Sequence, residues 1–320
     1  MKSLLHVTFL SLLLCFAACN QSDKAAQNDN SAKSQDSLSE DPALKIMQVD
    51  GANLHYLEKG KGTPLVFVHP GYSDYRTWRN QIDALSKEYR VIAYSRRYNF
   101  PNDTPVDSTS MFSMVHVNDL VALIKSLNTG PVHLAGHSAG GWIALQAALH
   151  HPELIKTLIL GEPAVADFYT GDSVGESYLN EFIQGVMRSN DAYRVNEDQK
   201  AVDIFFGLVM GKEDYFQNLS EADRDIIMDN VSESKAAALV KNPKVEAPLP
   251  ITCKKLQELT IPVLLICGED SPKFVSYMQD KLEPCLQTKE RITLPNTSHG
   301  LHYESPEAFN TAVLQFMRKH

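Results

Sequence analysis

Cysteine is scarce in this chain, with five residues among 320, so a small scaffold held by disulfides is excluded. Dense Lys/Arg tracts are absent, and the formal net charge of −9 argues against a broad nucleic-acid footprint. The sequence shows neither a metal-ligand spacing nor a glycine-rich loop for a phosphate or dinucleotide, so we expect no metal and no cofactor. What is present is an ordinary globular composition with 43% hydrophobic residues, which excludes a wholly disordered chain.

The apolar run at the N-terminus predicts a targeting signal that is not part of the folded domain. Lys2 precedes apolar residues 4–18, a run too short for a helix that crosses a membrane. The run ends in FAAC, and small residues before Cys19 resemble a bacterial lipobox, although Phe16 stands where Leu is usual. This resemblance implies a lipoprotein signal peptide over residues 1–18 and lipidation of Cys19. A plain secretory signal is the alternative.

The segment after Cys19 predicts a flexible tether. Residues 20–41 contain no aromatic and no β-branched side chain, and Leu38 is their only large aliphatic residue. Such a stretch cannot bury enough apolar area to offset its ordering entropy. We therefore interpret residues 19–42 as a lipidated cysteine and a disordered tether. The protein is expected in the bacterial cell envelope, as a lipoprotein on the periplasmic or outer-surface side, with the lipid anchor as its only membrane contact.

Three cysteines remain after the tether. Cys267 ends the apolar run 263–267, which is typical of a buried strand, so we interpret it as a small core residue. Cys253 and Cys285 could pair in an oxidising compartment, but the sequence contains no geometry that decides it.

From residue 43 onward, strand and helix patterns alternate. Residues 45–49 and 53–57 flank the Asp50-Gly51 turn and predict a hairpin, and the continuous apolar run 64–69 predicts a buried parallel strand. Further strands are expected at 90–94, 132–135, 158–160, 261–268 and 290–294, and helices at 78–89, 115–127, 141–150, 273–282 and 306–318. This alternation predicts an α/β fold with a parallel sheet and helices on both faces.

The alternation stops between residues 164 and 250, where only helical patterns occur. Helical spacing covers 178–187 and 202–209, and one further helix is expected over 221–240. We interpret residues 164–250 as a helical lid inserted between two core parts, residues 43–163 and 251–320. Its apolar faces could pack on the core and also roof a pocket.

A possible nucleophile lies in VHLAGHSAGG, residues 132–141, which has the pattern strand, G-x-S-x-G, helix. Ser138 would sit at a sharp turn where a Cβ at Gly136 or Gly140 would be crowded. A serine hydroxyl needs a base to take its proton. His299 follows the last predicted strand and is the expected base, with His302 as its competitor. His116 and three other histidines are interpreted as packing or surface residues.

The base in turn needs a carboxylate to hold its tautomer. Asp270 follows the predicted strand 261–268, and Glu162 follows the predicted strand 158–160. Both therefore lie at carboxyl ends of parallel strands, where the sites of such sheets form. At this level the residues leave both candidates open.

An oxyanion formed on attack by Ser138 needs two backbone donors. One is expected to be the N–H of Ala139, at the start of the following helix. The other should come from the loop HPGY at residues 69–72. Pro70 has no N–H, so Gly71 is the expected donor and Tyr72 the alternative, while His69 is expected to brace the loop.

Four motifs occur in order: HPGYSDYRTW from residue 69, YSRRYNFPND from 94, GHSAGG from 136 and SHGLHYESPEAFN from 298. Together they resemble the α/β-hydrolase fold superfamily over about residues 45–320. They are most similar to lidded bacterial serine hydrolases with an arginine-rich SRRY loop and a Glu-Pro dipeptide after the sixth strand. The resemblance implies a mostly parallel eight-stranded sheet with helices on both faces and a helical lid after the sixth strand.

The sequence departs from the family pattern in two places. The oxyanion loop reads His-Pro instead of the usual His-Gly. The usual G-x-x-D after the seventh strand, counted from Gly268, falls on Ser271, so that Asp270 is one residue early. Some relatives, such as certain haloalkane dehalogenases, carry the acid after the sixth strand, where Glu162 stands. We therefore favour Glu162 as the acid and keep Asp270 as the alternative.

The nucleophile separates the relatives by chemistry. Dehalogenases and epoxide hydrolases of this fold use Asp at that place, whereas Ser138 implies acyl transfer through an acyl-enzyme. We expect a serine hydrolase that cleaves a carboxylic ester of a small or medium-sized substrate. A C–C bond or amide hydrolase with the same triad, or a non-enzymatic ligand-binding module, are the alternatives. Arg96 and Arg97 could bind an acidic substrate or pair with nearby carboxylates.

Overall fold

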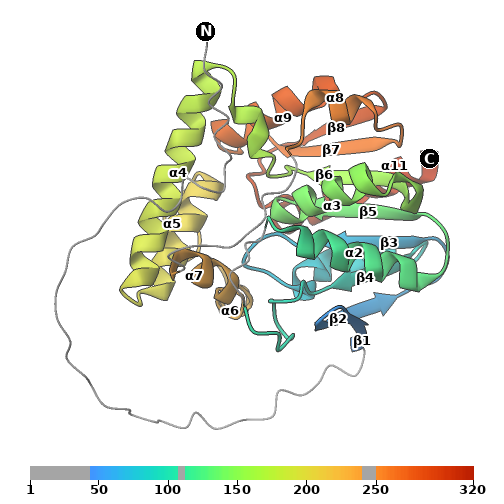
Figure 1. The fold of residues 1–320 in the computed structure, drawn as a ribbon, viewed down its shortest axis with the longest axis horizontal. Coiled ribbons are helices and arrows are strands. Elements are labelled where there is room, and N and C mark those ends of the chain that lie inside the picture. The colour runs from blue at the N-terminus through green and yellow to red at the C-terminus, as the bar shows by residue number, and fades with distance from the viewer. Residues whose placement is uncertain (1–43, 107–111, 240–249) are drawn as a thin grey trace.

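A computed structural model of the chain describes residues 44–106, 112–239 and 250–320 (Figure 1). The predicted signal peptide over residues 1–18, the lipidation site Cys19 and the tether up to residue 42 lie outside the described residues.

The centre of the fold is one eight-stranded sheet. Its strands, in spatial order, are β1 (Leu44–Val49), β2 (Ala52–Lys59), β4 (Arg90–Tyr94), β3 (Pro64–Val68), β5 (Val132–His137), β6 (Ile155–Gly161), β7 (Val263–Gly268) and β8 (Lys289–Leu294). The strands from β4 to β8 in this order pair in parallel, but β2 pairs antiparallel with both β1 and β4. The sheet is thus mixed, and the prediction of a mostly parallel sheet is wrong. The turn at Asp50-Gly51 reverses the chain between β1 and β2, and β2 is the strand that runs opposite to both of its neighbours.

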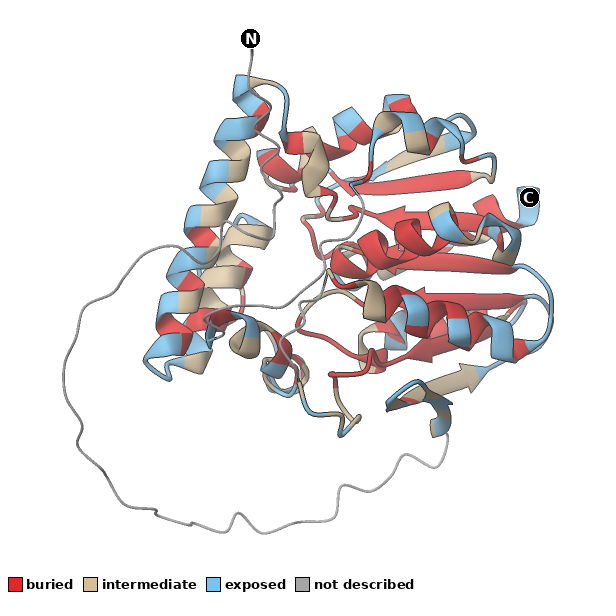
Figure 2. Cartoon of the chain, in the orientation of Figure 1, coloured by how far each residue is buried: buried red, intermediate tan, exposed pale blue. Residues whose placement is uncertain are grey.

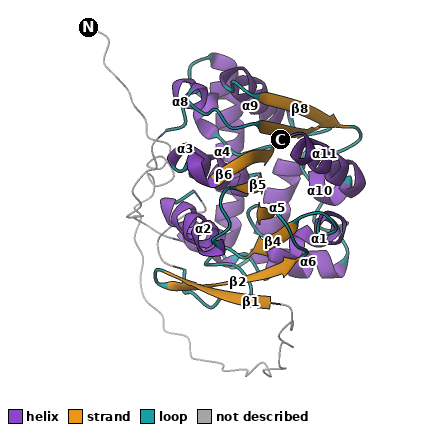
Figure 3. Cartoon of the chain, turned by 90° about the vertical axis from the view of Figure 1, so that its right-hand side faces the viewer, coloured by secondary structure: helices purple, strands orange, loops and turns teal. Residues whose placement is uncertain are grey.

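Helices cover both faces of the sheet, as Figure 3 shows from the side. One face carries α2 (Met114–Leu127), α3 (Ala139–His150), α8 (Cys253–Gln257) and α9 (Lys273–Leu282), and the other carries α1 (Arg79–Leu85), α10 (Leu301–Glu304) and α11 (Pro306–Lys319). Short 3₁₀ helices lie at Tyr75–Trp78, Pro152–Leu154, Ala166–Tyr169 and Glu283–Cys285. The central strands are buried from both sides (Figure 2), which explains the continuous apolar runs in their sequences.

Four helices lie between β6 and β7: α4 (Ser173–Arg194), α5 (Asp198–Met210), α6 (Glu221–Met228) and α7 (Ser232–Leu239). We call these four helices the helical insertion. They stand together beside the sheet, at the left of Figure 1, and no strand occurs in the described part of 164–250. The insertion has its own apolar cluster, which includes Tyr193, Phe206 and Phe216, and Tyr72 from the core enters it.

The single helix predicted over residues 221–240 is in fact two helices, α6 and α7. The side chain of Asn230 lies at the break and is held by two core loops. Its Nδ2 donates to Asp74 Oδ2 at 2.7 Å, and its Oδ1 accepts from the backbone N–H of Phe100 at 2.8 Å. These bonds favour a non-helical connection at this point, and they involve residues too distant in sequence for helical spacing to indicate them.

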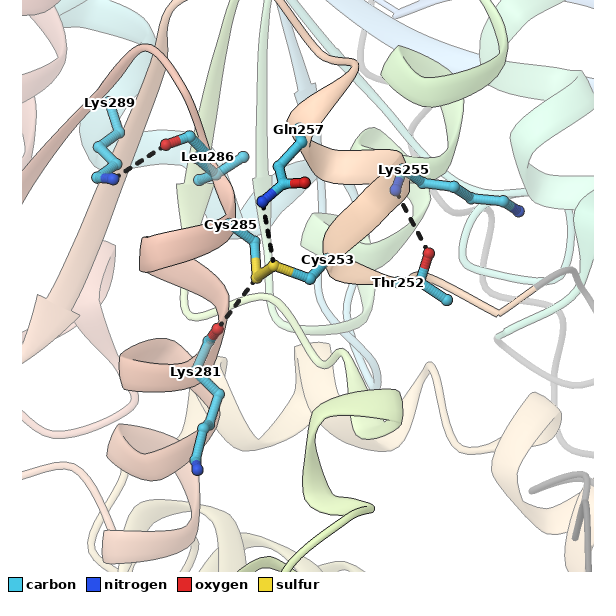
Figure 4. The surroundings of a disulfide bond; sticks show 8 residues. All are labelled: Thr252, Cys253, Lys255, Gln257, Lys281, Cys285, Leu286 and Lys289. Carbon is cyan, nitrogen blue, oxygen red and sulfur yellow. Dashed lines mark hydrogen bonds between the residues drawn. A yellow bond between two sulfur atoms is a disulfide. The ribbon is translucent and has the colours of Figure 1, made fainter.

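Cys253 and Cys285 form a disulfide that joins α8 to the 3₁₀ helix after α9 (Figure 4). The two cysteines are 32 residues apart in sequence, a separation for which chain entropy gives a stabilisation of about 3–4 kcal/mol. Cys267 is a buried free thiol on β7, where burial raises its pKa to about 12.

Candidate active site

Ser138 lies at a sharp turn between β5 and α3. Its backbone adopts φ 53° and ψ −119°, an uncommon conformation for a residue with a Cβ. The turn is fixed by its N–H, which donates to the carbonyl of Gly161 at 2.9 Å. A Cβ on Gly140 would overlap the backbone carbonyls of Val68 and His69, so only glycine lets the loop after β3 pass this closely. The start of that loop therefore lies directly against the first turn of α3.

Glu162 and His299 come together although 137 residues separate them in sequence. Glu162 directly follows β6, and its Oε2 lies 2.6 Å from His299 Nδ1. Its other oxygen, Oε1, accepts the backbone N–H of Gly268 at 2.8 Å, so both carboxylate oxygens are engaged and fully buried. In a neutral ring, a proton on Nδ1 that is donated to Glu162 leaves Nε2 with its lone pair. This is the tautomer that a general base requires.

Asp270 has a different setting. Its side chain is exposed, and no hydrogen bond or ion pair joins its carboxylate to the described residues. Its backbone N–H donates to the carbonyl of Thr297 at 2.9 Å. This bond fixes the backbone at Asp270, while the carboxylate is exposed to solvent. The structure therefore brings Glu162, and not Asp270, to His299.

Contacts of Ser298 and of the His299 ring fix the loop that carries His299. Ser298 donates through its N–H and its hydroxyl to the two oxygens of Glu304, at 2.6 and 2.8 Å. The ring of His137, the residue before Ser138, packs against His299 with ring centroids 4.7 Å apart. Since His137 is the neighbour of Ser138, this contact places the imidazole of His299 beside the sharp turn at Ser138, which we call the elbow. The sequence did not indicate a role for His137, because the residues around it do not show that its ring packs on His299.

His302 faces the core instead. Its Nε2 lies 3.0 Å from Thr77 Oγ1, and its ring packs on Trp78 with centroids 4.5 Å apart. Burial, helped by electrostatic interaction with His299 and with the Arg79 guanidinium, lowers the pKa of His302 to about 3. The competitor for the role of base is thus a buried neutral imidazole that contacts the 3₁₀ helix Tyr75–Trp78.

The low pKa of His302 predicts a pH-dependent stability. In the unfolded chain an imidazole has a pKa near 6.5, so between pH 6.5 and 3 the unfolded state binds one more proton than the folded state. The contribution of His302 is complete above about pH 6.5 and is lost as the pH falls. At pH 5 the loss is about 2 kcal/mol. Urea unfolding at pH 7 and pH 5 measures how far the free energy of unfolding decreases between these pH values. In the His302→Gln variant this decrease should be about 2 kcal/mol smaller than in wild type. Equal losses would contradict this.

The loop after β3 holds the predicted oxyanion donors. Its residue Tyr72 has φ 56° and buries its side chain in the cluster of the helical insertion, with its ring centroid 4.8 Å from that of Phe205. His69 braces the loop, since its Nδ1 lies 2.8 Å from the carbonyl oxygen of Pro70. Gly71 follows Pro70 in this loop, and Ala139 is the first residue of α3.

Both arginines after β4 pair with carboxylates. Arg97 binds Asp119 of α2 through Nε at 2.7 Å and Nη2 at 2.5 Å. Arg96 Nη2 lies 3.1 Å from Glu233 Oε2, on α7 of the helical insertion. His116 is also part of this group, with Nε2 2.7 Å from Glu233 Oε1. The sequence did not indicate Glu233, because an acidic residue in a helix is usually solvated.

Within residues 44–106, 112–239 and 250–320, no three His, Cys, Asp or Glu side chains gather in a way that could hold a metal ion. None of the helices in the described part of the chain combines the length and apolar character needed to cross a bilayer.

The chain matches a known protein family. The family model of the alpha/beta hydrolase family matches residues 65–312, so the chain belongs to this family. It is 24% identical to epoxide hydrolase 4 of Mus musculus, over 84% of this chain and 77% of that protein. It is 23% identical to 2-hydroxy-6-oxo-6-(2'-aminophenyl)hexa-2,4-dienoic acid hydrolase of Metapseudomonas resinovorans, over 86% of this chain and 91% of that protein.

Among solved structures, a carboxylesterase of Bacillus subtilis shares the fold. It superposes with a TM-score of 0.66 and 20% identity, covering 87% of this chain and 92% of that one. The relatives thus include hydrolases of several substrate classes, and membership of the family supports an enzyme that is a hydrolase.

Proposed function

We propose that this protein is a serine hydrolase that cleaves a carboxylic ester of a small or medium-sized substrate through an acyl-enzyme. The observation that carries the proposal is the 2.6 Å contact between Glu162 Oε2 and His299 Nδ1. It fixes the tautomer of an imidazole that lies beside the strained turn at Ser138.

The proposed reaction uses these side chains and water. His299 Nε2 takes the proton of Ser138 Oγ, and Oγ forms a bond to the ester carbonyl carbon. The N–H groups of Ala139 and of Gly71, or Tyr72 as the alternative, stabilise the resulting oxyanion. As the intermediate collapses, the bond to the alcohol oxygen breaks and His299 returns the proton to that oxygen. Water then forms a bond to the acyl carbon while His299 takes one of its protons. The bond between that carbon and Ser138 Oγ breaks, His299 returns the proton to Oγ, and the acid leaves.

The nucleophile favours acyl transfer over epoxide opening. An epoxide hydrolase of this fold needs a carboxylate that attacks carbon, whereas position 138 carries a hydroxyl. Cleavage of a C–C bond by the same residues is the second candidate, favoured by the similarity to the dienoic acid hydrolase. Amide hydrolysis and non-enzymatic ligand binding have no observation in their favour.

A substrate panel separates the two candidates. We expect p-nitrophenyl acetate and butyrate to be turned over. The matched p-nitroanilides and the β-diketones should react far more slowly. Cleavage of a β-diketone faster than that of either ester would replace the ester proposal by the C–C candidate. If no substrate is cleaved and no acyl-enzyme forms, the hydrolase proposal fails.

We also propose that the helical insertion roofs the substrate site as a lid. Its support is contact with the loop that holds the oxyanion donors: Tyr72 enters the apolar cluster of the insertion, and Glu233 of α7 reaches the loop after β4. Insertion residues would then limit the size of the acyl or alcohol group.

For the location, we propose a lipoprotein of the bacterial cell envelope, anchored through Cys19. The residues before Cys19 support it, and so does the disulfide between Cys253 and Cys285, since such bonds persist in oxidising compartments. A Cys19→Ser chain should leave the membrane fraction. Its continued sedimentation with membranes after a salt wash would contradict the anchor.

A further inference from the structure

A buried ion pair joins the helical insertion to the core. The side chain of Arg96 is 0% exposed and that of Glu233 is 3% exposed, and Arg96 Nη2 lies 3.1 Å from Glu233 Oε2. Burial alone would raise the pKa of Glu233, but the charge of Arg96 and the interaction with His116, whose Nε2 lies 2.7 Å from Glu233 Oε1, outweigh it and lower this pKa to about 2. Glu233 is therefore ionised, and it fixes the direction of the Arg96 guanidinium.

Arg96 also contacts the loop that follows β3. Its backbone N–H donates to His69 Nε2 at 3.0 Å, and its Nη2 lies 3.5 Å from the carbonyl oxygen of Pro70. Because Nε2 accepts, a neutral His69 carries its proton on Nδ1 and donates it to the same Pro70 oxygen at 2.8 Å. Burial, together with the charge of Arg96, keeps the pKa of His69 well below its ordinary value, so the ring stays neutral.

The Pro70 carbonyl decides where the next N–H points. In a trans peptide the C=O and the following N–H point in opposite directions. The bond from Pro70 to Gly71 is trans, since the one cis peptide of the described residues precedes Pro101. Two donors that hold the Pro70 oxygen on one side therefore turn the Gly71 N–H to the other side. Gly71 has no side chain that would hold it there otherwise.

We propose that Arg96 and Glu233 are positioning residues for the oxyanion hole. Glu233 on α7 holds Arg96, and Arg96 with His69 holds the Pro70 carbonyl. This orients the Gly71 N–H toward the oxyanion that forms after attack by Ser138. The inference rests on the proposed function, and it makes the helical insertion a structural part of the oxyanion hole.

The test must separate orientation from stability. Loss of Glu233 alone leaves the Arg96 charge buried without a counter-ion, which is destabilising in itself. The Arg96→Met/Glu233→Leu double variant removes both charges and should fold, since apolar pairs often replace buried ion pairs without loss of stability. Asp223→Asn is the matched control, because Arg79 and Asp223, 2.5 Å apart, also join the core to the insertion but lie outside the loop after β3.

Two quantities are measured for each folded variant: kcat and KM for p-nitrophenyl butyrate, and the inhibition constant of an alkyl trifluoromethyl ketone, whose serine adduct carries an oxyanion. For Glu233→Gln and the double variant, kcat should fall by about 10- to 100-fold, somewhat less than for complete loss of a donor. KM should change little, and ketone affinity should fall in parallel with kcat. Asp223→Asn should change kcat by about twofold at most.

A double variant that folds and keeps both wild-type kcat and ketone affinity would overturn the inference and leave the proposed function intact. Wild-type protein that neither cleaves the ester nor binds the ketone would overturn the proposed function, and the inference with it.

Discussion

Replacing Ser138 by alanine should lower kcat for p-nitrophenyl butyrate by a factor on the order of 10⁴ or more, with the fold unchanged. The reason is that the substitution removes the hydroxyl oxygen that forms the acyl bond, and the remaining donors can only polarise the ester. The fold should survive because the elbow is fixed through backbone atoms. The Ser138 N–H donates to Gly161, and its carbonyl accepts from Trp142 at 3.1 Å.

The measurement is ester turnover at saturating substrate, with circular dichroism and thermal unfolding as the check on folding. Ser126→Ala on α2 is the matched control, since that hydroxyl lies within hydrogen-bond distance of the Leu123 carbonyl in its own helix and of Met47 Sδ on β1, and of no residue of the proposed site. A Ser138→Ala protein that retains more than about a tenth of the wild-type rate would remove Ser138 from the reaction.

The second large effect is expected for the carboxylate. Glu162→Gln should lower kcat by about 10⁴-fold, because the amide can donate to His299 Nδ1 and so place the ring proton on Nε2. In that tautomer His299 cannot accept the proton of Ser138. Asp270→Asn should change kcat by about twofold at most, since its side chain is exposed and does not contact His299.

The two variants are compared over pH 5 to 9 with the same ester. If Asp270→Asn shows the steep loss, or if both variants lose a similar and small amount, the assignment of Glu162 as the acid is wrong. A chemical denaturation curve for Glu162→Gln shows whether the buried amide has also disturbed the fold.

The elbow could be predicted from sequence because its chemistry is local. A turn from strand to helix around Ser138 needs glycines within two residues, and that pattern stands in the chain as one short motif. A local motif could not show which carboxylate contacts the base His299. Glu162 and Asp270 follow neighbouring strands, β6 and β7, and only the orientation of each side chain separates them.

Other features depend on contacts between distant segments. The break between α6 and α7 is set by hydrogen bonds from Asn230 to two core loops. Arg96 and Glu233 pair although they are far apart in sequence, and no periodic pattern in the sequence relates them. The antiparallel pairing of β2 with β4 was missed for another reason. A hairpin predicts how its own strands run, but not which neighbour it takes in the sheet.

The most direct test of the account is the reaction with a fluorophosphonate, which phosphonylates a serine only when a neighbouring base has activated it. We expect one adduct per chain by intact mass, located at Ser138 by peptide mapping, and no adduct in the Ser138→Ala variant. An unlabelled wild-type protein, or an adduct at another residue, would contradict the claim that His299 and Glu162 activate Ser138.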